Sequence, residues 1–179
     1  MRTWYDKWRD LVSSVIFYAL VGAACLALVE FGSKYKLAKV DEQFREMEPK
    51  IAHGEYARVN RRICRPDQLH YTDIIMYRVP MWKRSSFHNA FARVVGLPGD
   101  VVEVKDHVLY RAERRDGKLG PRQRVSEPYL RPGTRSRNFS PFVVPRNCVF
   151  ALYDERSGRG SLRDHIIPAR SIRGRVIGK

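Results

Sequence analysis

The sequence has few of the residues that build metal centres and disulfide frameworks. Its three cysteines, Cys25, Cys64 and Cys148, form no C-x-x-C pair, and its five histidines are scattered without ligand spacing. This pattern predicts no metal site, and the sequence indicates no cofactor. Cys64 and Cys148 can form a disulfide only if the chain lies in an oxidising compartment, which the sequence leaves open.

Acidic residues are also scarce relative to basic ones. The 179 residues include 19 Asp and Glu against 34 Lys and Arg, which gives a formal net charge of +15. The basic residues are spread over residues 58–175 rather than gathered in a tail. Such an excess predicts an anionic neighbour, and a basic membrane-surface or nucleic-acid-binding module is one function that it permits. Aromatic residues within positions 111–137 are too few for a base-stacking platform, so nucleic acid is the less favoured partner.

Only one apolar run is long enough to cross a membrane. Residues 11–29 are apolar apart from small residues and serines, and about 19 residues at about 1.5 Å each span about 28 Å. A cleavable signal peptide is the alternative, but its apolar region is normally about 7–15 residues long. Residues 30–32 are also a poor cleavage site. We expect a retained anchor over residues 1–32, with an interfacial aromatic belt formed by Trp4, Tyr5 and Trp8.

The segment after the anchor carries apolar residues three or four positions apart. These residues are Leu37, Val40, Phe44 and Met47. The spacing predicts that residues 33–49 continue as a juxtamembrane helical stalk, which ends at Pro49. The apolar stripe either packs on the protein's own domain or docks a membrane-protein partner. Both interpretations stay open.

The rest of the chain, residues 50–179, is organised around residues 92–110. Two β-branched runs, residues 92–95 and 101–104, flank a turn signal that contains Gly96, Pro98 and Gly99. Residues 105–107 form a second turn before another short apolar run. Further strands are predicted over residues 73–80 and 142–153. The fold class is therefore mainly β, with a single N-terminal transmembrane helix.

Two stretches of this domain resemble one family. Arg93-Val94-Val95-Gly96-Leu97-Pro98-Gly99-Asp100 resembles the G-L-P-G-D box of type I signal peptidases, and residues 167–175 match that family's closing I-P-x-x-x-I-x-G-R pattern. Residues 72–77, 127–130 and 154–156 give supporting matches. The resemblance covers residues 49–179 and implies a signal-peptidase-like β domain over residues 50–179. The compact size is similar to that of the maturation peptidases of conjugative pilins.

The resemblance also implies a cellular location. Type I signal peptidases are serine–lysine proteases anchored in the bacterial inner membrane, with the large domain on the periplasmic or outer side. The basic residues around the anchor do not decide the orientation, because the two sides are nearly balanced. Arg2, Lys7 and Arg9 precede the span, and Lys34, Lys36 and Lys39 follow it.

The family's two catalytic residues are replaced in this chain. The position of the lysine general base falls on Ala92, and that of the serine falls on Lys50 or, in a second register, on Glu55. A serine–lysine protease needs a hydroxyl within hydrogen-bond reach of a neutral amine. Neither group is present at these positions. The resemblance therefore implies a pseudoenzyme.

Local substitutes keep an alternative open. Ser85 and Ser86 lie beside Lys83, and Glu55 lies near His53, although both groupings are more typical of a solvated surface. An active signal peptidase or pilin maturation peptidase with non-standard catalytic residues is therefore the alternative function.

Peptide binding does not need the missing groups. By resemblance, the substrate lies as an added strand between two edges, Gly54, Glu55, Tyr56 and Ala90, Phe91, Ala92. We expect a protein that binds an extended segment of a precursor, for example a pilin, and that is catalytically impaired.

Overall fold

The computed structural model describes residues 4–40, 47–52, 54–80, 87–156 and 161–178. The chain divides into two compact units, Met1–Lys36 and Leu37–Lys179. The first unit consists mainly of one helix, α1 (Trp4–Lys34). Within it Leu11–Lys34 is long and apolar enough to cross a membrane, and none of its most apolar window is buried in protein. Apolar side chains without protein neighbours favour a lipid environment, so α1 fits a membrane anchor.

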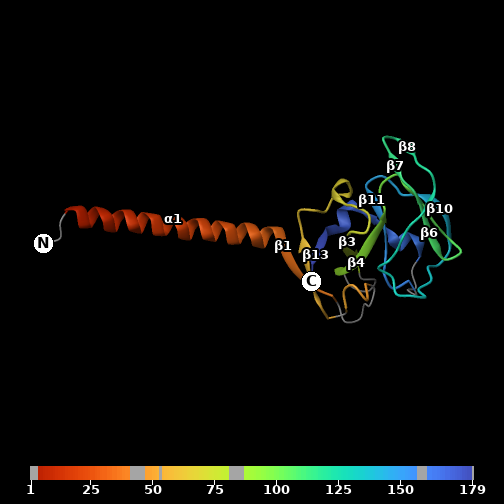
Figure 1. Ribbon diagram of the computed structural model, residues 1–179, viewed down its shortest axis with the longest axis horizontal. Helices are drawn as coiled ribbons and strands as arrows, with labels where there is room; N and C mark the ends of the chain where they lie inside the picture. Colours follow the sequence, from red (N-terminus) through yellow and green to blue (C-terminus); the bar gives the residue numbers. More distant parts are fainter. Residues whose placement is uncertain (1–3, 41–46, 53, 81–86, 157–160, 179) are drawn as a thin grey trace. The chain divides into compact units, whose positions relative to one another are not determined.

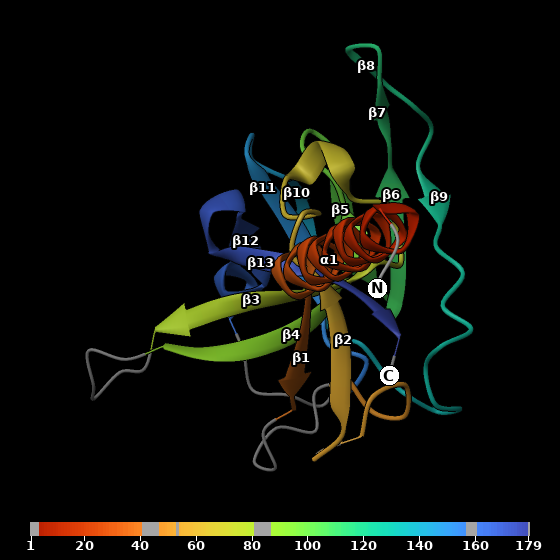
Figure 2. The same ribbon diagram turned by 90° about the vertical axis from the view of Figure 1, so that its left-hand side faces the viewer.

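Strands make up most of the regular secondary structure in the second unit (Figure 1). A seven-stranded sheet has the order β1-β2-β13-β3-β4-β11-β12, and a four-stranded sheet has the order β10-β5-β6-β9. A short β7–β8 hairpin extends beyond β6 (Figure 2). The strand bounds are β1 Tyr35–Lys39, β2 Tyr56–Asn60, β3 Ile74–Pro80, β4 Phe87–Gly96, β5 Val101–Lys105, β6 Val108–Ala112, β7 Arg114–Arg115, β8 Lys118–Leu119, β9 Gln123–Arg124, β10 Phe139–Val143, β11 Cys148–Leu152, β12 Ile166–Pro168 and β13 Ile172–Gly178. Three short 3₁₀ helices complete the unit: η1 Pro66–Gln68, η2 Leu162–His165 and η3 Ala169–Ser171.

The two turns predicted around residues 92–110 are present. β4 ends at Gly96, and β5 begins after the turn at Val101. Gly99 has a φ of +89°, and an added Cβ would lie 2.7 Å from the Arg114 side chain, so the turn requires glycine. The second turn joins β5 to β6 through Asp106 and His107, whose φ values of 51° and 66° match a type I′ turn.

β4 contributes to all three hydrophobic clusters of the unit. Its side chains alternate between the faces of the sheet, as strand geometry requires. Ala90, Ala92 and Val94 lie in one cluster with Ile75 and Tyr77. Phe91 packs into a second cluster, and Val95 packs into a third. The central box is therefore also the centre of the core.

The predicted helical stalk over residues 33–49 is wrong for the residues that the structure describes there. α1 ends at Lys34, and β1 follows it as a strand. Leu37 is 66% exposed, whereas Val40 and Met47 are 5% and 1% exposed in the domain's own core. The apolar stripe is therefore not presented to a partner as a helix face, because packing against the sheet overrides the helical spacing. Phe44 lies outside the described residues.

The three cysteines are free thiols, so Cys64 and Cys148 form no disulfide in this structure. Burial raises the pKa of the Cys148 thiol. A thiol with a raised pKa is a poor nucleophile and a poor metal ligand near neutral pH. Cys148 is therefore a poor candidate for a nucleophile or a metal ligand.

Gly174, in the closing pattern, provides a test of the sheet. Its φ is +151°, and an added Cβ would lie 2.5 Å from the Asn60 carbonyl oxygen of β2. Backbone cannot move aside as a side chain can, so Gly174→Ala should lower the free energy of unfolding by more than about 1 kcal/mol. Urea unfolding of the full chain in detergent measures this. Gly178→Ala is the control, because its Cβ would meet only the flexible Arg58 side chain. Equal effects of the two substitutions would show that the close approach of the Asn60 carbonyl does not require glycine at position 174.

Candidate functional site

A buried ion pair joins the central box to the segment after β11. Arg93 Nε donates to Asp154 Oδ1 at 2.8 Å, and Arg93 Nη2 donates to Asp154 Oδ2. Arg93 Nη1 donates to the Thr72 carbonyl at 3.0 Å. The two side chains are 7% and 0% exposed. This bidentate geometry fixes β4, the turn before β3 and the end of β11 relative to one another.

A second layer of contacts covers this ion pair. The Arg93 guanidinium lies 4.1 Å from the centroid of the Tyr129 ring. The Tyr129 hydroxyl donates to Glu127 Oε1 at 2.8 Å, and Arg156 Nη2 donates to the same oxygen. Burial, reinforced by the charge of Glu127, raises the pKa of Tyr129. The supporting motifs at residues 127–130 and 154–156 therefore meet in space around the central box.

Asp100, the last residue of the central box, has a structural role. Its carboxylate is 1% exposed and accepts the Leu97 N–H at 2.8 Å, the Arg114 N–H at 2.9 Å and the Tyr71 hydroxyl at 2.9 Å. Burial is the main cause of a raised pKa at Tyr71, and the Asp100 charge adds to it. Asp100 therefore holds the turn between β4 and β5, and its hydrogen bonds are committed to that turn.

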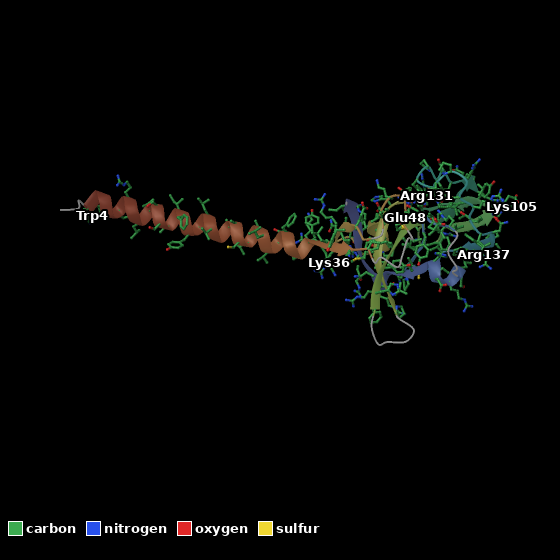
Figure 3. The ribbon with its side chains drawn as sticks, turned by 90° about the horizontal axis from the view of Figure 1, so that it is seen from below. Trp4, Lys36, Glu48, Lys105, Arg131 and Arg137 are labelled. Carbon is green, nitrogen blue, oxygen red and sulfur yellow. The ribbon has the colours of Figure 1, made fainter. Side chains whose placement is uncertain are left out.

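Position 92, onto which the resemblance places the family's general base, is buried among apolar side chains. Ala92 is 0% exposed and packs in the cluster that contains Ile75 and Tyr77. A lysine must be buried to lose its proton near neutral pH. Every lysine that the structure describes in the second unit is exposed, including Lys105 in Figure 3: Lys39, Lys50, Lys105 and Lys118. The described residues thus supply no desolvated lysine.

Lys50, the first of the two serine-equivalent positions, lies in a turn at the start of the domain. Met47 and Ile51 on either side are 1% and 3% exposed, and the Ile51 N–H donates to the Met47 carbonyl at 2.9 Å. Glu48 pairs with Arg131 at 3.0 Å (Figure 3). Lys50 itself is exposed. At one of the two positions onto which the resemblance places the family's serine, the chain therefore carries an exposed lysine.

The predicted edge at Gly54, Glu55 and Tyr56 is covered by the protein's own chain. The Gly54 N–H donates to the Val40 carbonyl at 3.1 Å, and the Val40 N–H donates to the Glu55 carbonyl at 2.9 Å. The Glu55 carboxylate accepts the Ala52 N–H at 3.0 Å. Strands β13 and β3 also lie between β2 and β4 in the sheet order. The two predicted peptide-binding segments therefore do not face each other as neighbouring strands.

The second predicted segment, Ala90 to Ala92, lies in β4 where one edge is open. Val94 exchanges hydrogen bonds with Thr72 and Asp73 on the β3 side. Because main-chain direction alternates along a strand, Asn89 and Phe91 direct their N–H and C=O groups to the opposite side. On that side β11 pairs with β4 only from Arg93 to Gly96. Within the described residues, no strand pairs with the remainder of this edge, which we call the open β4 edge (residues 87–92).

A large cavity adjoins the open β4 edge. Its volume is about 1850 Å³, and it is lined by the end of β3, by Phe87 at the start of β4, by residues 135–139, by the segment after β11, and by residues around η2 and η3. The hydroxyls of Tyr77 and Tyr153 lie 3.0 Å apart in its wall. None of the six predicted peptide-binding residues lines it in the described structure. The sequence gives no local signal for this cavity, because its walls come from segments far apart along the chain.

Serine and histidine side chains in the cavity wall have structural partners. Ser161 Oγ accepts the Arg163 N–H, and Ser171 Oγ donates to the Pro168 carbonyl at 2.7 Å. His165 Nδ1 lies 3.2 Å from the Ala151 carbonyl oxygen. Burial lowers the pKa of His165, against smaller opposing effects of that carbonyl and of Asp164. Among the described residues, no group of three or more His, Cys, Asp or Glu could hold a metal ion.

The suggested substitutes for the catalytic pair are not tested by this structure. Lys83, Ser85, Ser86 and His53 all lie outside the described residues. The Glu55 carboxylate accepts the Ala52 N–H within its own turn.

Comparison with known proteins found one matching family and several similar solved structures. A family model described as signal peptidase, peptidase S26, matches residues 12–177. Among solved structures, 18 chains match. One is a signal peptidase I from Enterococcus faecalis V583, at 21% identity and a TM-score of 0.45, with 60% of this chain and 96% of that chain covered. No match was found among curated proteins.

The fold and the joined boxes define the class of protein as a β domain of the signal peptidase type, carried with one apolar helix. Because the family model spans nearly the whole chain, the chain belongs to the signal peptidase family, peptidase S26. This confirms the predicted family and the predicted mainly β fold class. The single apolar helix and the family together fit a membrane-anchored protein.

The buried ion pair predicts a large loss of stability when one partner is neutralised. Asp154→Asn leaves the Arg93 charge buried without a counter-ion, which should cost about 3–5 kcal/mol in urea unfolding. Replacing both partners, with Arg93→Met and Asp154→Leu, should recover part of that loss. Arg115→Gln is the control, because Arg115 is 82% exposed in its pair with Glu113 and should change the midpoint little. A small effect of Asp154→Asn would refute a structural role for the pair.

His165 predicts a dependence of stability on pH. Its pKa in the folded protein lies below the ordinary value of 6.5. The unfolded chain therefore binds a proton first, and stability should fall as the pH drops below about 6.5. His165→Gln should flatten this part of the profile in urea unfolding from pH 7.5 to 5. His70→Gln is the control, because the His70 side chain is 78% exposed. A profile unchanged by His165→Gln would show that other groups cause the decline.

Proposed function

We propose that this member of the signal peptidase family binds an extended segment of a precursor protein and does not cut it by the family's serine–lysine mechanism. The segment adds as a strand along the open β4 edge. The observation that carries this proposal is the combination of that unpaired edge with the large cavity beside it. Main-chain hydrogen bonds give such strand addition its affinity, so no catalytic group is needed.

The loss of proton transfer supports a binding role. A methyl group at position 92 cannot accept a proton, and it lies in an apolar cluster at 0% exposure. The alternative serine positions carry Lys50 and Glu55. Removing a base and a nucleophile together should abolish the ordinary reaction. The Arg93–Asp154 pair and the turn at Asp100 hold the β domain together and support its use as a scaffold for a bound peptide.

We extend this proposal to a bacterial inner-membrane location, with the β domain on the periplasmic or outer side. The apolar helix α1 and the family membership support the membrane part. A membrane-inserted precursor such as a pilin suits this location, because its segment and the β domain would be held at the same membrane.

The test uses the full chain in detergent with a signal-bearing pre-pilin. We expect a stable complex in size-exclusion chromatography and no cleavage product by mass spectrometry over prolonged incubation. A signal peptidase that retains the serine and lysine serves as the positive control for cleavage. Specific cleavage products would overturn the inactive assignment, and the absence of any complex would overturn the binding role.

Two substitutions at one position test the open β4 edge in the same assay. Asn89→Pro removes an N–H that faces the open side and should weaken binding about 2–10-fold, the effect of one main-chain hydrogen bond. Asn89→Ala keeps that N–H and is the matched control. Equal weakening by both substitutions would indicate a side-chain contact and would contradict strand addition at this edge.

A further inference from the structure

We propose that the bound segment is acidic, and that its carboxylates lie in the cavity beside the open β4 edge. This inference rests on the proposed function and adds the chemistry of the segment. The cavity wall carries six arginines against two carboxylates: Arg78, Arg135, Arg137, Arg156, Arg170 and Arg173 against Glu155 and Asp164. A concave wall of one sign concentrates ions of the opposite sign.

Most of this positive charge is not neutralised by the protein itself. Among the described residues, five of the six arginines make no ion pair: Arg78, Arg135, Arg137, Arg170 and Arg173. Asp164 is committed to the start of η2, where its carboxylate accepts the Ser161 N–H at 2.7 Å. The cavity therefore presents guanidinium groups that are available to a ligand, and guanidinium pairs well with carboxylate.

Arg156 adds a buried cation with unmet donors. Its side chain is 4% exposed, and Nη2 donates to Glu127, which also accepts the Tyr129 hydroxyl. Within the described part of the chain, Arg156 Nε and Nη1 have no hydrogen-bond partner, and neither does Arg173 Nε. Unmet donors on a buried cation are costly. A carboxylate on a bound segment can supply the missing acceptor after the side-chain adjustment that commonly accompanies binding.

The size and the apolar surface of the cavity favour a peptide over a free anion. Its volume of about 1850 Å³ exceeds the ~300–1,000 Å³ typical of small-molecule sites. Tyr77, Val79, Phe87 and Tyr153 supply apolar and aromatic wall beside the arginines. A free phosphate would leave that surface unused. An extended segment can run its main chain along β4 and place side chains against both the apolar wall and the arginines of this cavity.

The experiment measures binding of two fluorescein-labelled peptides to the full chain in detergent by fluorescence anisotropy. One peptide alternates valine with glutamate, and the other alternates valine with glutamine. We expect the glutamate peptide to bind at least about tenfold more tightly, which corresponds to one charged hydrogen bond. We also expect its affinity to fall with added salt more steeply than that of the glutamine peptide.

Two charge-reversal variants separate the cavity from the overall charge. Arg170→Glu reverses an exposed arginine in the cavity wall and should weaken the glutamate peptide about tenfold or more. Lys118→Glu makes the same change in net charge on β8, away from the cavity, and should leave affinity nearly unchanged. Arg137→Glu is a second variant in the cavity wall, and it provides the same test if Arg170→Glu does not fold.

Each contrary outcome has a distinct meaning. Equal affinity for the two peptides, or equal effects of Arg170→Glu and Lys118→Glu, would overturn the acidic preference while leaving strand addition intact. Failure of both peptides and of the pre-pilin to bind would overturn the proposed function as well. Displacement of the glutamate peptide by inorganic phosphate at constant ionic strength would assign the cavity to a free anion. Tight binding of a single-stranded oligonucleotide that Arg170→Glu abolishes would assign it to nucleic acid, and either result would overturn the proposal.

Discussion

A buried charge in the middle of a sheet needs a counter-ion. In this protein the pair formed by Arg93 and Asp154 meets that need and joins distant segments of the β domain. Arg93 sits in β4 at the junction of the hydrophobic clusters, where an unpaired guanidinium would cost several kcal/mol. Asp154 meets that requirement from the far end of β11. The pair then supports Tyr129 on the outer face of the guanidinium, and Tyr129 holds Glu127. Motifs separated along the chain are therefore parts of one buried assembly.

The alternation of β4 explains how such a scaffold can exist without the family's base. Adjacent residues of a strand point to opposite faces, so Ala92 and Arg93 belong to different environments. Ala92 lies among apolar neighbours, while Arg93 holds the ion pair. A change from lysine to alanine on the first face leaves the second face untouched. A substitution at position 92 and retention of the fold are therefore compatible in this domain, because Ala92 and Arg93 lie in separate environments.

The sequence predicts local features of this fold well. The turns at Gly99 and at Asp106 and His107 depend on short-range backbone chemistry, and they occur where expected. The sequence does not reveal the strand character of β1. Leu37, Val40 and Met47 fit a helical repeat, but contacts with distant strands decide their burial. Short apolar patterns do not specify which surface will cover them.

The candidate site depends even more on contacts between distant segments, which the sequence pattern does not predict. Pairing of Val40 with Glu55 covers an edge that the family resemblance left open, and no residue near Glu55 signals this. The cavity joins Phe87, Arg137 and Arg170, which are far apart along the chain. The arginines looked like a uniform basic surface in the sequence. In the structure some of them stack on tyrosines, as Arg111 does on Tyr71, and six others line the cavity.

The open β4 edge has a consequence for the behaviour of many copies in one membrane. Unpaired strand edges promote self-association, and confinement to a surface makes collisions between identical chains frequent. The arginine-lined wall reaches this edge at Phe87, and repulsion between the like charges of two copies would oppose edge-to-edge contact. The same guanidinium groups that we propose bind an acidic peptide would thus also oppose self-association of the protein.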